Sequence, residues 1–306
     1  MNFGTQIDYL KQVAFFFIML PVKIGLQLSV SPYTWGFELT PFLITAYFII
    51  MMLFASWCFI KFSKDAAVGV VLFSIFIYFC LTNMTWLPLI FIFGLIGYRI
   101  GGFKLSLTII ASFMFITFTG VLPQALLSIY LCGIAVIISF ILGSSLGIWA
   151  AHNEKVSAFM RPINDTMQTM PSFVILIPFV MFFGIGEFTA LLAIIAYAFV
   201  PAMRYTEHGL RNLPETVIEA ARMIGCSQTQ LLWKVKIPLA MPVIMLGLNQ
   251  TIMFGLAMLV IAALVGTTGL GQLIYIGLSK ADFGTGMISG VSIALIAIIF
   301  DRTTQA

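Results

Sequence analysis

The chain has 306 residues, of which 61% are hydrophobic and only 8% charged, whereas an ordinary soluble domain is roughly 25% charged. A soluble globular domain is therefore excluded, and most side chains must face lipid or other buried helices. The net charge of +4 comes from basic residues scattered at the ends of apolar segments, which indicates membrane topology and argues against nucleic-acid binding. We expect an all-α polytopic membrane protein in a lipid bilayer.

Ten apolar segments approach the roughly 20 residues that a helix needs to cross a bilayer. The first is interrupted by Pro21 and Lys23, so an interfacial helix remains an alternative there. The apolar run after Lys11 lacks a clear small-residue cleavage site, so we expect no cleavable signal peptide. In chain order the segments are 12–30, 41–60, 66–80, 84–98, 104–119, 125–149, 172–185, 188–203, 239–265 and 286–300.

Lysine and arginine gather in alternate loops between these segments. The intervening loops are nearly free of them, with Lys280 the main exception. By the positive-inside rule, the basic loops and both chain termini are expected in the cytoplasm. The residues that carry this argument are Lys61, Lys64, Arg99, Lys104, Lys155, Arg161, Arg204, Arg211, Arg222, Lys234, Lys236 and Arg302.

The cysteines and histidines do not have metal-ligand spacing. We expect the cysteines to be small buried hydrophobic residues without a disulfide, and the isolated histidines to be solvated. No metal or cofactor is expected. The residues concerned are Cys58, Cys80, Cys132, Cys226, His152 and His208.

Polar side chains within the apolar segments are few. Asn249, Gln250 and Thr251 lie in the middle of one apolar run, where they could line a pathway or hydrogen-bond between helices. Gln168 is a weaker candidate for a pathway, and Glu187 is expected to be an exposed loop carboxylate.

Several kinds of chemistry are missing from the sequence. The C-terminal segments hold almost no Asp, Glu or His. A proton- or sodium-coupled transporter would therefore lack the ionisable side chains that usually carry the coupling ion through the membrane. The chain has no G-x-x-x-x-G-K-[ST] phosphate loop, so it is not expected to hydrolyse ATP. No catalytic triad or carboxylate pair falls at one membrane depth, which disfavours a membrane enzyme. Energy for any transport would have to come from another polypeptide.

The longest polar interruption runs from Arg204 to Pro238. Asn212 is expected to cap a short amphipathic helix that has Pro214 in its first turn, and Gly225 suits the left-handed residue that ends it.

A second short helix is expected to follow. Ser227 and Gln230 match a capping box at its start, and Pro238 is expected to limit it before the next span. The pair forms a helix–turn–helix hairpin. It could be a well-capped connector, but links between helices usually take only ~2–8 residues, which favours a docking hairpin for a soluble subunit.

The hairpin carries a spaced motif: Glu-Ala-Ala, three residues, Gly, nine residues, and then an aliphatic residue, one residue and an aliphatic-Pro pair. It falls on Glu219, Ala220, Ala221, Gly225, Val235, Ile237 and Pro238. This motif resembles the signature of ABC importer permeases. Residues 161–173, 236–242, 247–251, 269–272 and 301–306 are similar to glycine betaine/proline betaine permeases.

This resemblance implies a type I ABC importer transmembrane fold in the cell inner membrane. It implies a homodimer of permease copies, two ATP-binding subunits and a periplasmic substrate-binding protein. Glycine betaine, proline betaine, trimethylamine N-oxide, choline or carnitine would be the solute. Glu219 would be the main polar contact to the ATPase, and Gly225 the turn that aims the hairpin.

The resemblance also implies a division of the chain. Residues 1–83 would be a membrane extension with about three segments, and 84–306 the permease domain, with its core at about 124–303 and a coupling loop at 204–238. Two alternatives remain open: a membrane scaffold or receptor that binds a cytoplasmic partner without transport, and a secondary transporter.

Overall fold

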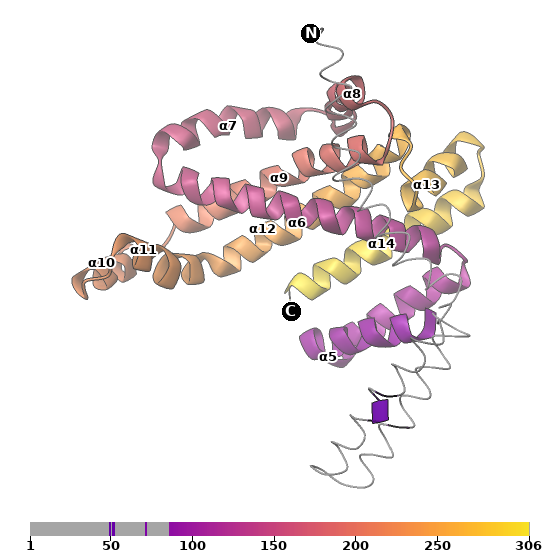
Figure 1. Cartoon of the computed structure of the whole chain (residues 1–306), viewed down its shortest axis with the longest axis horizontal. Coiled ribbons are helices and arrows are strands. Elements are labelled where there is room, and N and C mark those ends of the chain that lie inside the picture. Colours follow the sequence, from indigo (N-terminus) through magenta and orange to yellow (C-terminus); the bar gives the residue numbers. More distant parts are fainter. Residues whose placement is uncertain (1–48, 50, 53–70, 72–85, 306) are drawn as a thin grey trace. The chain divides into compact units, whose positions relative to one another are not determined.

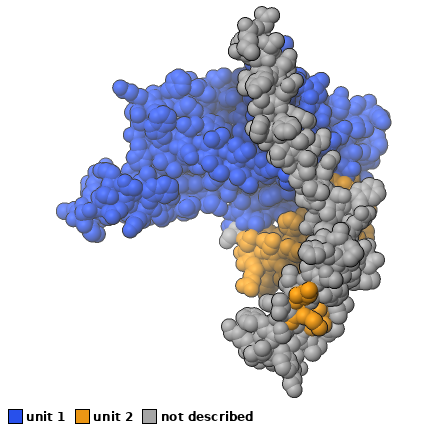
Figure 2. Space-filling model, viewed as in Figure 1, with its two compact units in different colours: residues 1–21, 124–306 blue, residues 22–123 orange. Residues whose placement is uncertain are grey.

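The structure, a computed structural model, describes residues 86–305 together with Ile49, Met51, Met52 and Val71. Within these residues every regular element is helical, as predicted (Figure 1). The expected segments 12–30, 41–60 and 66–80 lie outside the described residues, apart from those few positions. The described chain divides into two compact units, one up to Pro123 and one from Gln124 onward (Figure 2).

The unit that ends at Pro123 contains α5 (Trp86–Phe118), which consists of two helical halves. The chain turns at Gly102, whose φ of 72° suits a residue without a side chain. Beyond the turn, the Ser106 hydroxyl donates a hydrogen bond to the Gly94 carbonyl at 2.8 Å, so the halves lie against each other. The two predicted segments on either side of residue 102 are thus both present as helices.

The unit from Gln124 onward holds the remaining elements, apart from the first residues of α6, and each of the five segments predicted there contains a helix. Two helices, α7 and α13, were not predicted. α7 is amphipathic and charged, so a search for apolar runs passes over it, and α13 is short. The elements are α6 (Leu122–His152), α7 (Glu154–Thr169), α8 (Ser172–Phe183), α9 (Glu187–Arg211), α10 (Glu215–Met223), α11 (Gln228–Gln230), the π-helical η2 (Leu231–Lys236), α12 (Ile237–Ala262), the 3₁₀ turn η3 (Ala263–Val265), α13 (Leu270–Ser279) and α14 (Phe283–Gln305).

Five of the described helical runs are long and apolar enough to cross a membrane. They are α5, α6, α9, the run from α11 to η3, and α14. A sixth crossing results if α7 and α8, which meet at a bend of 104°, form one broken span. The bend falls at Met170, which is extended because the following residue is Pro171.

α9 packs closely between α6 and α12, and glycines allow the approach. A Cβ on Gly147 of α6 would lie 2.7 Å from the Met203 carbonyl oxygen of α9. On α12, a Cβ on Gly247 would lie 2.7 Å from the Cβ of Tyr205. Small residues are the usual means by which membrane helices bring their backbones together. The three helices run side by side in Figure 1 and form the core of this unit.

Candidate functional site

The polar segment begins as helix, because α9 continues through Arg211. Its last turns are held by Leu210, which packs in a buried cluster with Ala240 and Ile244 of α12. Asn212 is the C-terminal cap of α9, and its backbone N–H donates to the His208 carbonyl at 3.1 Å. The prediction that Asn212 caps the following helix is therefore wrong.

α10 begins at Glu215 without a side-chain cap. Pro214 is its N-cap residue and not part of its first turn as predicted, whereas the end of the helix is as predicted. Gly225 has a φ of 87°, in the left-handed region. The Gly225 N–H donates to the Arg222 carbonyl at 2.9 Å, and the Cys226 N–H donates to the Ala221 carbonyl at 3.3 Å. These two bonds form a Schellman motif, which satisfies the last carbonyls of the helix.

The capping box is also confirmed. The Gln230 N–H donates to the Ser227 hydroxyl at 3.3 Å, and the Ser227 N–H donates to the Gln230 side chain at 3.0 Å. Pro238, however, does not end the second helix, which runs on through η2 into α12. The proline lies in the first turn of α12, directly after the wide π-helical turns of η2. There its missing N–H and its ring are accommodated without a break.

We call residues 212–236 the hairpin. The hairpin end is the end of the helix bundle that lies next to it, where α6 and α9 end and α7 begins. The tip of the hairpin is apolar and exposed: Met223 is 90% exposed and Ile224 is 84% exposed. Glu219 and Ala220 are also exposed, whereas Ala221 is buried. The hairpin thus presents a carboxylate and two large apolar side chains away from the helix bundle.

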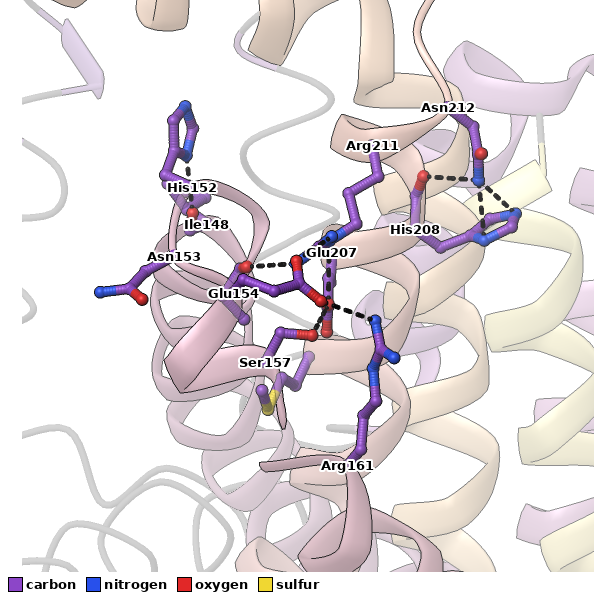
Figure 3. A network of polar contacts seen from close by, with 12 residues as sticks. Ile148, His152, Asn153, Glu154, Ser157, Arg161, Glu207, His208, Arg211 and Asn212 are labelled. Carbon is purple, nitrogen blue, oxygen red and sulfur yellow. Dashed lines mark hydrogen bonds and ion pairs between the residues drawn. The ribbon is translucent and has the colours of Figure 1, made fainter. Parts of the chain in front are cut away.

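A network of charged side chains lies at the hairpin end (Figure 3), and the sequence did not predict it. The Arg211 guanidinium contacts the Glu154 carboxylate at 2.8 Å, the Ala150 carbonyl at 2.8 Å and the Glu207 carboxylate at 3.0 Å. The buried Ser157 hydroxyl donates to the same Glu207 at 2.6 Å. We call these five residues the Arg211 cluster. It joins the end of α6, the start of α7 and the end of α9.

The charges of the cluster affect each other. The hydrogen bond and the positive charge of Arg211, together with the charge of Arg161, hold the pKa of Glu154 below its ordinary value. The i,i+4 spacing of Glu207 and Arg211 at the end of an apolar run is the one signal in the sequence that could have indicated this site.

Next to the cluster, a cleft of about 770 Å³ opens between α7 and α9. An ion pair between Arg204 of α9 and Asp165 of α7 joins its walls. Asn164 is buried there, and its side-chain oxygen has no hydrogen-bond partner among the described residues. The lining residues are Arg161, Asn164, Asp165, Arg204, Tyr205, Glu207, His208, Arg211 and Asn212. We call this space the α7–α9 cleft.

The polar residues of the spans do not form one group. Asn249 is buried on α12 and donates to the Asp301 carboxylate of α14 at 2.8 Å. Thr251 is buried and donates to the Gly247 carbonyl of its own helix at 2.7 Å. Gln250 is half-buried, and Gln168 is exposed in the last turn of α7.

Three further predictions concern single residues. Glu187 is not a loop carboxylate, because it lies in the first turn of α9, half-buried, and accepts a hydrogen bond from Thr268 at 3.0 Å. His152 and His208 are both exposed at the hairpin end. In the described part of the chain, no three potential metal ligands come together.

The chain matches a known protein family and two named relatives. A family profile described as "Binding-protein-dependent transport system inner membrane component" matches residues 143–302, just over half of the chain. The chain is 41% identical over 217 residues to the glycine betaine/proline betaine transport system permease protein ProW of Escherichia coli (strain K12). This alignment covers 71% of this chain and 61% of ProW. The chain is also 43% identical over 207 residues to the trimethylamine N-oxide transport system permease protein TmoV of Pelagibacter ubique (strain HTCC1062). That alignment covers 67% of this chain and 29% of TmoV.

A similar fold occurs among solved structures. An inward facing structure of the MetNI methionine ABC transporter matches with a TM-score of 0.54 and 20% identity, over 58% of this chain and 90% of that chain. At this identity the likeness concerns the fold alone. Against the sequence relatives, the chain spans only about three fifths of the length of ProW.

Proposed function

Since the chain belongs to the family of binding-protein-dependent transport system inner membrane components, we propose that it is the permease subunit of an ATP-driven importer for a compatible solute. The predicted type I ABC importer transmembrane fold agrees with the likeness to the MetNI transporter. The observation that carries the proposal is the ordered hairpin between two membrane-length helices, with its exposed Glu219 and apolar tip.

In this function the hairpin docks on a separate ATP-binding subunit. Glu219 makes the polar contact, and the exposed Ala220 allows close approach. The buried Ala221 accepts the Cys226 N–H that closes the turn, and the left-handed Gly225 sets the direction of that turn. Pro238 lies in the first turn of α12, the helix that carries the movement into the membrane. The side chains of Met223 and Ile224 add apolar surface that is exposed in this chain and would be covered in the complex.

The assembly would contain two copies of this chain, two ATP-binding subunits and a periplasmic substrate-binding protein. The hairpin and the chain termini would lie in the cytoplasm, in keeping with the basic residues near them. The transport domain would comprise residues 84–306, with its core at about 124–303, a range that includes the family match.

The solute would be a small molecule with a fully substituted, methylated nitrogen. The names of ProW and TmoV support glycine betaine, proline betaine or trimethylamine N-oxide, with choline and carnitine as relatives of the same chemistry. Because Asn249 and Thr251 already have hydrogen-bond partners within the protein, Gln250 and Gln168 are the better candidates for the pathway.

The test is reconstitution in liposomes with the ATP-binding subunit and the binding protein. Uptake of radiolabelled glycine betaine should require ATP and the binding protein, and the chain alone should not hydrolyse ATP. Hydrolysis that ignored both solute and binding protein would contradict an importer.

Substitution at residue 225 tests the hairpin itself. Gly225→Val should uncouple or dissociate the ATPase, because a β-branched residue is strained at a φ of 87°. Gly225→Asn is the matched control, since asparagine tolerates the left-handed region, and it should retain uptake. Equal transport by both variants would show that the turn does not aim the hairpin.

A further inference from the structure

α6 and α7 are attached to α9 in different ways. α6 meets α9 backbone to backbone at Gly147, whereas α7 is joined to α9 largely through polar side chains on either side of the α7–α9 cleft. α7 also ends at the 104° bend to α8. The position of α7 relative to α9 can therefore change without separating closely packed backbones.

Arg211 lies where such a change would begin. It is the last residue of α9, and α10 begins only four residues later at Glu215. One guanidinium contacts α6 through Ala150, α7 through Glu154 and its own helix through Glu207. The Arg211 and Glu207 side chains are only 30% and 13% exposed, so these contacts are partly sheltered from water.

We propose that Arg211 is a positioning residue for transport, which transmits a displacement of the hairpin to α7 through Glu154 and through Glu207 with Ser157. A force that turns the end of α9 moves both the guanidinium and Glu207. The first turn of α7 follows, because Glu154 is bonded to the guanidinium and Ser157 is bonded to Glu207. This inference rests on the proposed function, since it needs an ATPase to displace the hairpin.

The chemistry requires arginine at this position. A planar guanidinium carries five N–H donors and can hold two carboxylates and a carbonyl at once in a defined geometry. A lysine ammonium keeps the charge but acts as a single point on a flexible stem. Arg211→Lys should therefore preserve the attraction to Glu154 while losing most of the directional linkage between the three helices.

The experiment measures solute taken up per ATP hydrolysed in liposomes that contain the complete complex. Couplings between sites typically correspond to about 5- to 150-fold effects, so Arg211→Ala should lower this ratio about tenfold, and Arg211→Lys by less. ATP hydrolysis itself should continue and lose its dependence on solute-loaded binding protein. A purely structural role would lower uptake and hydrolysis together and leave the ratio unchanged.

Two controls make the result specific. Arg99→Ala removes an exposed arginine from the other compact unit and should leave the ratio at the wild-type value. Adding Glu154→Gln to Arg211→Ala should cause little further loss, because the linkage through Glu154 is already broken. If wild-type protein showed no ATP-dependent uptake, the proposed function would fail; if it transported and Arg211→Ala kept the wild-type ratio, only this inference would fail.

A second measurement tests the movement of α7 without changing Arg211. Cysteines replace Asp165 and Arg204, which face each other across the cleft, in a variant lacking the four native cysteines. Bridging them with a short, cleavable thiol reagent should stop uptake, and cleavage of the bridge should restore it. Full uptake by the bridged protein would overturn the proposal.

Discussion

The contacts of α9 with α6 and with α7 differ in the kind of interaction that holds them. At the first, Gly147 places two backbones so close together that a single added carbon would collide with Met203. At the second, hydrogen bonds and an ion pair connect side chains around an open cleft. Close packing tolerates little change in volume, whereas partly exposed ion pairs contribute little and can re-form. The first contact is rigid and the second is adjustable.

The rigid contact should respond most strongly to substitution. Gly147→Val adds a branched side chain where a Cβ would lie 2.7 Å from the Met203 carbonyl oxygen. We expect it to lower the free energy of unfolding by more than the ~1–3 kcal/mol usual for overpacking by a methylene. The thermal unfolding midpoint of detergent-purified protein measures the effect.

Gly133→Val is the control, because a Cβ there would meet nothing within 4 Å. It should change the free energy of unfolding by no more than about 1 kcal/mol. Equal destabilisation by both substitutions would mean that the close approach of α6 and α9 is not what Gly147 provides.

The adjustable contact should respond less. Ser157→Ala removes the buried hydroxyl that donates to Glu207, and hydrogen bonds to charged groups contribute about 1.5–3 kcal/mol. Thermal unfolding with and without the change measures this loss. Ser145→Ala, at an exposed serine bonded to its own helix, should stay within about 0.5 kcal/mol of wild type. If Ser157→Ala left the free energy of unfolding unchanged, the Ser157–Glu207 hydrogen bond would not stabilise the contact between α7 and α9.

The contact between α12 and α14 offers a third case for comparison. Asn249 donates to Asp301 at 2.8 Å, and such bonds between membrane helices contribute about 0.6 kcal/mol on average and up to about 1.7 kcal/mol. A double-mutant cycle with Asn249→Ala and Asp301→Ala should give a coupling energy in this range. Altered solute preference with no coupling energy would instead assign Asn249 to the pathway.

The smallest effect is expected at exposed Glu154, and it depends on pH. Arg211 lowers the pKa of this carboxyl below its ordinary value of 4.5, so the stabilisation is fully present above that value and is lost as pH falls through the lowered pKa. The difference in unfolding midpoint between wild type and Glu154→Gln should therefore be constant near neutral pH and vanish in acid. In an Arg211→Ala background, that pH-dependent difference should be smaller, because only the charge of Arg161 then lowers the pKa of Glu154.

Local signals made the hairpin predictable. Gly225 ends α10 and the Ser227–Gln230 pair opens the next helix, and each motif acts within a few residues of the chain. Asn212 was assigned wrongly because it can cap either neighbouring helix. The choice depends on how far α9 continues, and the buried packing of Leu210 against α12 decides that.

The Arg211 cluster could not be predicted in the same way. Arg211 is 57 residues from Glu154 along the chain, and Ser157 is 50 residues from Glu207. Nothing in the spacing of these residues shows that they meet. The meeting depends on the reversal of the chain between α6, α7 and α9, and on the glycines that bring α6 against α9.

The sequence by itself determined the membrane class, most of the described apolar spans, and the turn and capping box of the hairpin, because hydropathy and helix caps act over short distances. The tertiary structure decided which polar residues are joined. It placed Asn249 against Asp301, opened the cleft beside α7, and brought Arg211 to Glu154 and Glu207. These contacts arise because helices distant in sequence pack at particular heights and angles, which no local pattern encodes.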